Sequence, residues 1–187
     1  AIRGRREHLL FTDTALYAMS FTGPPAVFSI RRAGSHGGIV GQNAAAEYNG
    51  VVYWMGAEDF FVYDGRIRVL NCPVRNTVFE DINLDQRTKF FAGLNSLFTE
   101  VWWFYCSANS REIDRYVVLN FNEGTWTFGA LARTAWVDRS EIAPQPLAAS
   151  RDGALYAHEI GDSDNGAPMD WHLNSFDIEL PAGEEDS

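Results

Sequence analysis

The chain has 187 residues, of which 46% are hydrophobic and 14% are aromatic, and its formal net charge is −10 at pH 7. That much apolar material is enough to build one or two packed domains, which excludes a disordered chain or a coiled coil. Trp, Phe and Gly are frequent and Lys89 is the only lysine, so an all-β fold is favoured over long amphipathic helices. No segment approaches about 18 uninterrupted apolar residues, so we expect no membrane insertion.

Short apolar segments bounded by turn residues predict two antiparallel meanders in the first part of the chain. The strands of the first meander are expected at residues 8–12, 15–21 and 27–33. After a glycine-rich linker, the second meander is expected to have strands at residues 44–49, 51–55, 60–63 and 66–70. Asn49-Gly50 and Asp64-Gly65 are strong hairpin signals, because both central residues of a type I′ turn need positive φ.

The pattern changes after residue 76, where residues 83–90 are best suited to a short helix with Asn83 or Asp85 as its N-cap. Strand signals then resume. A third meander is expected at residues 91–95, 100–106, 114–121 and 125–130. A fourth is expected at residues 132–138, 147–150, 155–159 and 170–178.

This unit of about four strands recurs roughly every 40 to 50 residues, which is the spacing of propeller blades. We therefore predict an all-β fold in which antiparallel four-stranded meanders form consecutive blades of a partial β-propeller. The chain opens on Ala1 and stops in a polar run, so residues 1–187 are expected to be a fragment of that domain. A β-sandwich of the same strands is the alternative. The predicted blades are residues 8–33, 44–75, 91–130 and 132–178.

Acidic residues are concentrated towards the carboxyl end, because every Arg and Lys lies at or before Arg151 while Asp and Glu continue to Asp186. An acidic surface repels phosphate, which disfavours a domain that reads a nucleic-acid sequence but suits a conduit past which DNA must slide. A solvated acidic face is the simpler interpretation.

Residues with catalytic or metal-binding chemistry form no motif in this chain. Cys72 and Cys106 lie in different predicted strands without Cys or His at metal spacing, and we interpret both as ordinary buried thiols. The histidines are far apart and build neither a His-Glu-x-x-His nor a Gly-x-Ser-x-Gly motif. The sequence therefore predicts no catalytic residue, cofactor or metal, and a protein that is not an enzyme. The histidines are His8, His36, His158 and His172.

Two loops resemble ligand-binding loops only in part. Residues 34–38 look like a phosphate loop but lack its Lys-Ser/Thr ending and open onto no helix, so they are interpreted as a linker between blades. Residues 162–166, Asp-Ser-Asp-Asn-Gly, resemble the start of a calcium loop. Leu173 stands where an EF-hand has its bidentate Glu, which excludes an EF-hand and leaves a looser surface ion as the alternative.

Carboxylates are abundant, and a glycosidase would need two of them facing each other across a cleft. The nearest candidates for such a pair are Asp138, Asp114 and Glu112. Arg133 and Asp138 flank Trp136 and are interpreted as two exposed charges on a β-turn, with a salt bridge between blades as the alternative.

Residues 120–126, Asn-Phe-Asn-Glu-Gly-Thr-Trp, are similar to the Asp-box turn of sialidase-like propellers, whose pattern is Ser-x-Asp-x-Gly-x-x-Trp. The match is partial, because Asn replaces both Ser and Asp and the Trp follows the Gly by two residues. Trp126 is therefore predicted to pack between blades, and an aromatic ligand platform is the alternative.

A more specific resemblance spans residues 100–136. It is carried by Glu-Val-Trp-Trp-Phe-Tyr-Cys at 100–106, Glu-Ile-Asp-Arg-Tyr-Val-Val at 112–118, the Trp126 turn and Leu-Ala-Arg-Thr-Ala-Trp at 131–136. These segments resemble the propeller of tail nozzle and tail hub (tail tubular) proteins of short-tailed bacteriophages. The resemblance extends more weakly to residues 10–13, 52–55 and 63–65.

The resemblance implies a virion protein that assembles as a homo-oligomeric ring, typically a hexamer beneath the portal and adaptor rings. DNA would leave through its lumen without sequence-specific binding, and an acidic lumen would aid passage. Two other classes stay open from the residues alone. One is a kelch-like propeller that binds a protein partner on one rim, and the other is a carbohydrate-binding or glycosidase-like propeller with a cleft lined by Trp and paired carboxylates.

Overall fold

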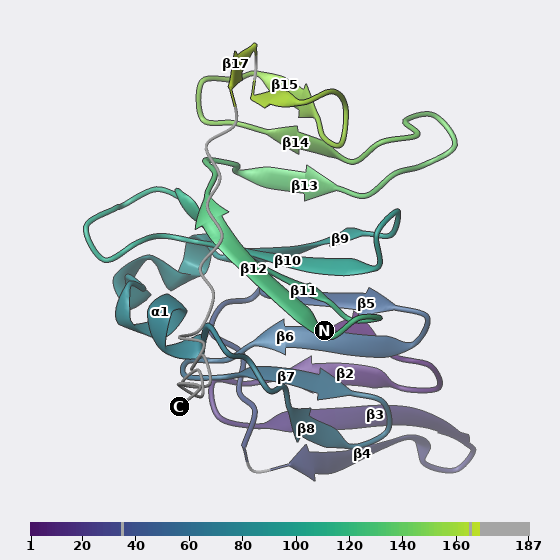
Figure 1. Ribbon diagram of the computed structural model, residues 1–187. Helices are drawn as coiled ribbons and strands as arrows, with labels where there is room; N and C mark the ends of the chain where they lie inside the picture. Colours follow the sequence, from purple (N-terminus) through teal and green to yellow (C-terminus); the bar gives the residue numbers. More distant parts are fainter. Residues whose placement is uncertain (35, 165, 169–187) are drawn as a thin grey trace, which may run out of the picture.

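A computed structural model describes residues 1–34, 36–164 and 166–168 and is all-β, with four antiparallel sheets in chain order (Figure 1). Sheet 1 contains β1 (Ile2–Arg3), β2 (His8–Phe11), β3 (Leu16–Gly23) and β4 (Val27–Gly34). Sheet 2 contains β5 (Ala45–Tyr48), β6 (Val51–Met55), β7 (Phe60–Tyr63) and β8 (Ile67–Val69). Sheet 3 contains β9 (Phe91–Asn95), β10 (Glu100–Tyr105), β11 (Arg115–Asn120) and β12 (Thr125–Ala130).

Sheet 4 is smaller and has three strands, β13 (Ala135–Val137), β14 (Leu147–Ala149) and β15 (Leu155–Ala157). A two-stranded ribbon of β16 (Ser163–Asp164) and β17 (Ala167–Pro168) follows it. The predicted meanders are thus confirmed as sheets, and the third matches its predicted limits of 91 and 130. Sheet 1 has one strand more than predicted, since β1 pairs with β2. The strand predicted at residues 170–178 lies outside the described residues.

The two Gly turns of sheet 2 differ from each other. Asn49 and Gly50 both have positive φ, 50° and 83°, as the predicted type I′ turn requires. At the second turn only Gly65 has positive φ, 121°, and Tyr63 pairs with Ile67. Three residues therefore separate these strands, and a two-residue type I′ turn at Asp64-Gly65 was the wrong prediction.

The described residues form two short helices between sheets 2 and 3. The predicted helix at 83–90 is present as a 3₁₀ helix, η1 (Leu84–Lys89), and the Asn83 side chain accepts a hydrogen bond from the Asp85 N–H at 3.2 Å, as an N-cap does. The second, α1 (Arg75–Glu80), was not predicted. It has no side-chain cap and buries only Val78, so it carries neither of the sequence signals by which a helix is recognised.

Each pair of neighbouring sheets is joined through a tryptophan. Trp54 of sheet 2 is fully buried against sheet 1, Trp103 of sheet 3 against sheet 2, and Trp136 of sheet 4 lies on Trp102 of sheet 3. Each indole N–H donates to a backbone carbonyl outside its own sheet, at 3.0, 3.3 and 2.6 Å respectively. The three accepting carbonyls are those of Gly37, Ala44 and Leu94.

Sheets 2 and 3 share the largest core. The Phe60 ring from β7 lies 4.9 Å from the Trp103 ring and 5.0 Å from the Trp126 ring, measured between centroids. Trp126 also stacks on Trp103 at 6.0 Å, and its indole N–H donates to the Asn71 carbonyl at 3.0 Å. Trp126 therefore packs between two sheets, as the sequence predicts.

The first strands of the sheets lie next to one another. β1 contacts β5, β5 contacts β9, and β9 contacts β13. A parallel bridge joins Asn43 to Phe91, where the Ala92 N–H donates to the Asn43 carbonyl at 2.8 Å. The opposite edges of the sheets are formed by β4, β8, β12 and β15.

Truncating Trp103 tests whether this core holds the sheets together. Trp103→Ala removes a fully buried ring and its indole hydrogen bond, and is expected to lower the free energy of unfolding by about 3–5 kcal/mol. Ile142 is 97% exposed, and Ile142→Ala is expected to change it by less than about 0.5 kcal/mol. Urea denaturation followed by tryptophan fluorescence measures both, and equal effects would contradict the prediction.

Candidate functional site

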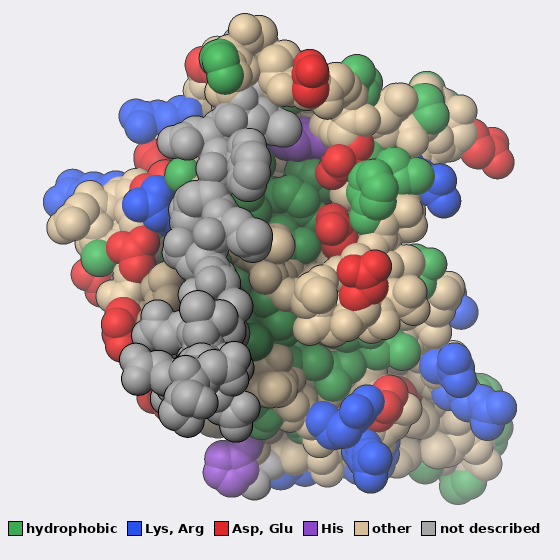
Figure 2. All heavy atoms as spheres, in the orientation of Figure 1, with side chains coloured by type: hydrophobic (Ala, Val, Ile, Leu, Met, Phe, Trp, Pro, Cys, Tyr) green, Lys and Arg blue, Asp and Glu red, His purple; other side chains and the backbone are tan. Residues whose placement is uncertain are grey.

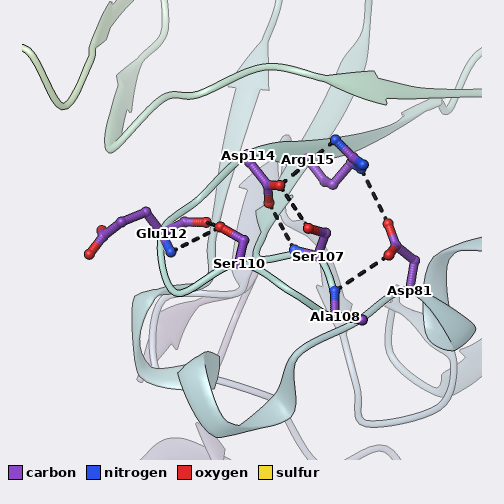
Figure 3. A network of polar contacts seen from close by, with 7 residues as sticks. All are labelled: Asp81, Ser107, Ala108, Ser110, Glu112, Asp114 and Arg115. Carbon is purple, nitrogen blue, oxygen red and sulfur yellow. Dashed lines mark hydrogen bonds and ion pairs between the residues drawn. The ribbon is translucent and has the colours of Figure 1, made fainter.

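The carboxylates favoured by sequence for a glycosidase belong to a polar network around the turn between β10 and β11 (Figure 3). Asp114 accepts hydrogen bonds from the Ser107 backbone N–H at 2.8 Å and from the Ser107 hydroxyl at 2.7 Å. It also lies 3.8 Å from the Arg115 guanidinium. Asp114 therefore closes the turn rather than facing open space.

Asp81 completes this network from the end of α1. Its carboxylate accepts from Arg115 Nε at 3.2 Å and from the Ala108 N–H at 3.4 Å. Arg115 thus lies between Asp81 and Asp114 and neutralises both, which ties α1 to sheet 3.

Glu112 and Asp138 serve other contacts. The carboxylate of Glu112 points away from Asp114 in Figure 3 and pairs with Lys89 Nζ at 3.0 Å. The hydrogen bond from Lys89 lowers the pKa of Glu112 below its ordinary value. Asp138 accepts from the backbone N–H groups of Ser96 at 3.1 Å and Arg139 at 2.8 Å. The three predicted carboxylates do not form a facing pair.

The structure instead brings together two carboxylates that the sequence did not indicate. The Asn95 amide nitrogen donates to Glu100 Oε2 at 3.2 Å and to Glu159 Oε1 at 3.0 Å. Asn95 and Glu100 are opposite residues of the β9–β10 pair, whereas Glu159 follows β15. We call Asn95, Glu100 and Glu159 the carboxamide bridge, since one side-chain amide joins sheet 3 to sheet 4.

Part of the carboxamide bridge is shielded from water. Asn95 is fully buried, and among the described residues its Oδ1 has no hydrogen-bond partner. Glu100 Oε2 also accepts from the Trp102 indole N–H at 2.9 Å. Burial raises the pKa of Glu100, and the nearby charge of Glu159 raises it further.

A carboxyl group with a raised pKa beside a second carboxylate is the arrangement of acid–base pairs in glycosidases. Here, however, the amide of Asn95 lies between the two carboxylates. The neighbouring ring of Trp102 is stacked on Trp136 at 5.2 Å and on Tyr116 at 4.9 Å, so its faces are already used. The geometry therefore supports a structural contact between sheets 3 and 4, in which two carboxylates share one side-chain amide.

Arg133 was predicted to be exposed on a β-turn, and this prediction is wrong. Its side chain is buried, its guanidinium carbon lies 4.3 Å above the Tyr156 ring, and its Nε donates to His158 Nε2 at 3.1 Å. In the described part of the chain Arg133 has no ion pair with Asp138, so the alternative of a salt bridge is wrong too. Arg133 lies beside an open hollow of about 450 Å³, which is lined by Ala132, Ser150, Arg151, Asp152 and Tyr156 as well.

The three loops singled out by sequence have structural roles where they are described. Residues 36–38 belong to the connection between sheets 1 and 2, as expected of a linker. Gly124 has a φ of 74° in the β11–β12 turn, where Asn120 Oδ1 accepts from the Asn122 and Glu123 N–H groups. In the calcium-like segment, Ser163–Asp164 pairs with Ala167–Pro168 as a ribbon, while Asn165 and Leu173 lie outside the described residues.

Both cysteines are free thiols, Cys106 buried and Cys72 half-buried. Burial raises the pKa of each thiol to about 11. At neutral pH neither is a thiolate, so neither is an activated nucleophile.

Within residues 1–34, 36–164 and 166–168, no three His, Cys, Asp or Glu side chains are placed to hold a metal ion. His8, His36 and His158 lie in different segments, and His172 is not among these residues. The described helices are also too short to cross a membrane.

No protein-family model matches the chain, and no curated protein matches it in sequence. Its function therefore has to be inferred from the residues and the structure.

The raised pKa of Glu100 predicts how stability depends on pH. The folded state holds the Glu100 proton more tightly than the unfolded state, so stability falls as pH rises above the ordinary value of 4.5. Glu100→Gln keeps an oxygen acceptor but cannot ionise. We expect the stability of this variant, relative to the wild type, to be greater at pH 7 than at pH 4 in urea denaturation.

Glu112→Gln is the matched control. The pKa of Glu112 is lowered, so its contribution to stability is present above pH 4.5 and is lost as pH falls. The relative stability of this variant should therefore change with pH in the opposite direction. Parallel pH curves for the wild type and Glu100→Gln would show that Glu100 has an ordinary pKa.

Thiol reactivity tests the environment of the cysteines. At pH 7 the folded protein should react with a disulfide reagent much more slowly than the same chain in concentrated urea, because both thiols are protonated and shielded. The single variants Cys72→Ser and Cys106→Ser show which reaction rate belongs to which thiol, because each retains only one cysteine. Fast reaction of either cysteine in the folded protein would contradict this expectation.

Proposed function

We propose that this chain is part of a β-propeller that serves as a structural ring component of the tail of a short-tailed bacteriophage. The propeller is supported mainly by the order of the sheets. Four meanders follow one another, and their first strands β1, β5, β9 and β13 are neighbours. In a propeller the blades are arranged radially around a central channel in this way.

A β-sandwich is less compatible with these contacts. A sandwich packs two sheets on each other across one core. Here there are three successive contacts, with Trp54 between sheets 1 and 2, Trp103 between sheets 2 and 3, and Trp136 between sheets 3 and 4. Such a series supports blades that repeat in one direction.

The tail role rests on the resemblance of residues 100–136 to tail nozzle and tail hub proteins. Those residues form β10, β11, β12 and the start of β13, and they supply Trp102, Trp103 and Trp126 to the contacts between sheets. The resemblance therefore concerns architecture, in keeping with a protein whose work is to form a wall. In that family the ring lies beneath the portal and adaptor rings of the virion, which gives the proposed partners.

The charge of the chain is compatible with a DNA conduit. A net charge of −10 repels phosphate, and a wall that repels DNA lets it pass without being held. In this proposal DNA is cargo and is not read.

A catalytic role has less support. Asp114, Glu112 and Asp138 are each used by turns or ion pairs, and the Glu100 and Glu159 carboxylates are bridged by an amide. The tryptophan faces that a sugar would need beside them are covered by Trp136 and Tyr116. We therefore propose a structural protein rather than an enzyme.

Electron microscopy of the particle that contains the chain tests this function. We expect a closed ring with rotational symmetry around an open axial channel wide enough for DNA, with the four sheets in its wall. A label fused to the chain should appear once per subunit around the ring. A particle without such a ring, or a label that lies away from it, would refute the tail role.

A further inference from the structure

The carboxamide bridge between sheets 3 and 4 has two features that packing alone does not explain. One is the Asn95 Oδ1 atom, which is buried and has no hydrogen-bond partner among the described residues. The other is the charge of Glu100 and Glu159, because none of the ion pairs in the described part of the chain includes either carboxylate. A buried oxygen and two unpaired carboxylates would all be stabilised by a nearby positive charge.

The electrostatic surroundings of the bridge are negative. Burial raises the pKa of Glu100, and the charges of Glu159 and Glu123 raise it further. Figure 2 shows red Asp and Glu side chains near one another where sheet 4 meets sheet 3, in the upper part of the view. A bound cation would favour the ionised form of Glu100, which burial and these charges disfavour.

The spacing of the polar atoms suits a cation with oxygen ligands. Asn95 Nδ2 lies 3.2 Å from Glu100 Oε2 and 3.0 Å from Glu159 Oε1. A half-turn about the Cβ–Cγ bond of Asn95 exchanges its nitrogen and oxygen, because the two ends of a carboxamide are nearly alike in shape. Oδ1 then lies about 3 Å from both carboxylate oxygens. Neighbouring ligands of one Ca²⁺ are about this far apart, since each lies roughly 2.3–2.6 Å from the ion.

The Asn95 amide is free to make this turn. Its Oδ1 has no hydrogen bond to a described residue, so nothing on that side fixes the orientation of the amide. The turn breaks only the two hydrogen bonds from Nδ2 to Glu100 and Glu159. A cation between the three oxygens replaces both of these contacts with stronger ones, because it attracts the two carboxylate charges directly.

We propose that the carboxamide bridge is a calcium site, in which Asn95 Oδ1, Glu100 and Glu159 bind one Ca²⁺ between sheets 3 and 4. Water completes the coordination, because Glu159 is exposed and Ca²⁺ takes six to eight oxygen ligands. Asn95 and Glu100 are opposite residues of β9 and β10, whereas Glu159 follows β15, so the ion ties sheet 4 to sheet 3. The ligands come from distant segments, and for this reason the sequence shows no metal-binding motif. The inference does not depend on the proposed phage role.

Ca²⁺ fits this ligand set better than Mg²⁺ does. The three ligands belong to β9, β10 and the segment after β15, and Glu100 Oε2 is also held by the Trp102 indole N–H at 2.9 Å. Ca²⁺ tolerates an irregular set of oxygens, whereas Mg²⁺ needs a near-ideal octahedron. Because the protein supplies three ligands and two charges, binding is expected to be weak, with a Kd of roughly 0.1–1 mM.

Terbium luminescence tests the site in the whole 187-residue chain. Tb³⁺ binds the same oxygen ligands as Ca²⁺ and emits when a nearby indole is excited, and the Trp102 indole is hydrogen-bonded to Glu100. Tryptophan excitation should therefore give terbium emission, and Ca²⁺ should displace the Tb³⁺ with a Kd of roughly 0.1–1 mM. Glu159→Gln removes one charged ligand and should weaken Ca²⁺ binding by about tenfold or more. A wild-type chain that binds no Ca²⁺ at about 10 mM, well above this Kd, would overturn the proposal.

Two carboxylates outside the bridge provide matched controls. Glu112→Gln removes a glutamate that pairs with Lys89, and Asp162→Asn changes the exposed first residue of the calcium-like segment 162–166. Both variants should bind Ca²⁺ like the wild type. If Asp162→Asn abolished binding while Glu159→Gln retained it, the ion would lie in that segment and the proposal would be wrong.

Asn95→Asp separates a calcium ligand from a purely structural amide. The added charge should tighten Ca²⁺ binding by about tenfold. In EDTA the variant should unfold at lower urea than the wild type, because three carboxylates then meet, and Ca²⁺ should restore much of the loss by mass action. A structural amide instead predicts the same loss with and without Ca²⁺, and that result would refute the site. Should Asn95→Asp not fold by circular dichroism, Glu159→Gln still decides, because it changes an exposed residue.

Discussion

The contact of Trp103 with Phe60 and Trp126 is the interaction on which the rest of the structure depends. It lies between sheets 2 and 3, where the buried cluster is largest, and it uses both the rings and the indole N–H of Trp103. The same device recurs with Trp54 and Trp136. A tryptophan suits this position because its ring buries a large apolar area while its N–H keeps a hydrogen-bonding partner. The packing of the large rings and the hydrogen bonds of the indole N–H groups thus both contribute to fixing the distance between sheets.

Local sequence patterns predicted the strands because hairpins form between neighbours in the chain. Sheet 3 was predicted most accurately, since its strands are long, aromatic and separated by distinct turns. Helix α1 was missed because it has no cap and only Val78 in the core. Its position follows from tertiary contacts, such as the ion pair of Asp81 with Arg115, that a local pattern does not contain.

The candidate site was predicted less well, for the same reason. Asp114 and Glu112 were singled out by residue type, yet Asp114 closes its own turn and Glu112 pairs with Lys89 of η1. The link of Glu100 to Asn95 was accessible in principle, because the two are opposite residues of one hairpin. Glu159 carries no such signal, since only the packing of sheet 4 on sheet 3 brings it there. For Arg133 the error was of another kind. A charged residue near a turn was expected to be solvent-exposed, but it is buried.

The serial order of the sheets has a consequence for how the molecule comes apart. Each sheet is stabilised mainly by the next one, so cooperativity passes along the stack through nearest neighbours, as in repeat proteins. Inner sheets lose two contacts when they open, whereas sheets 1 and 4 lose one. Local unfolding should therefore start at the ends and proceed inward, so that the pair around Trp103 is the last to exchange its amide hydrogens with solvent.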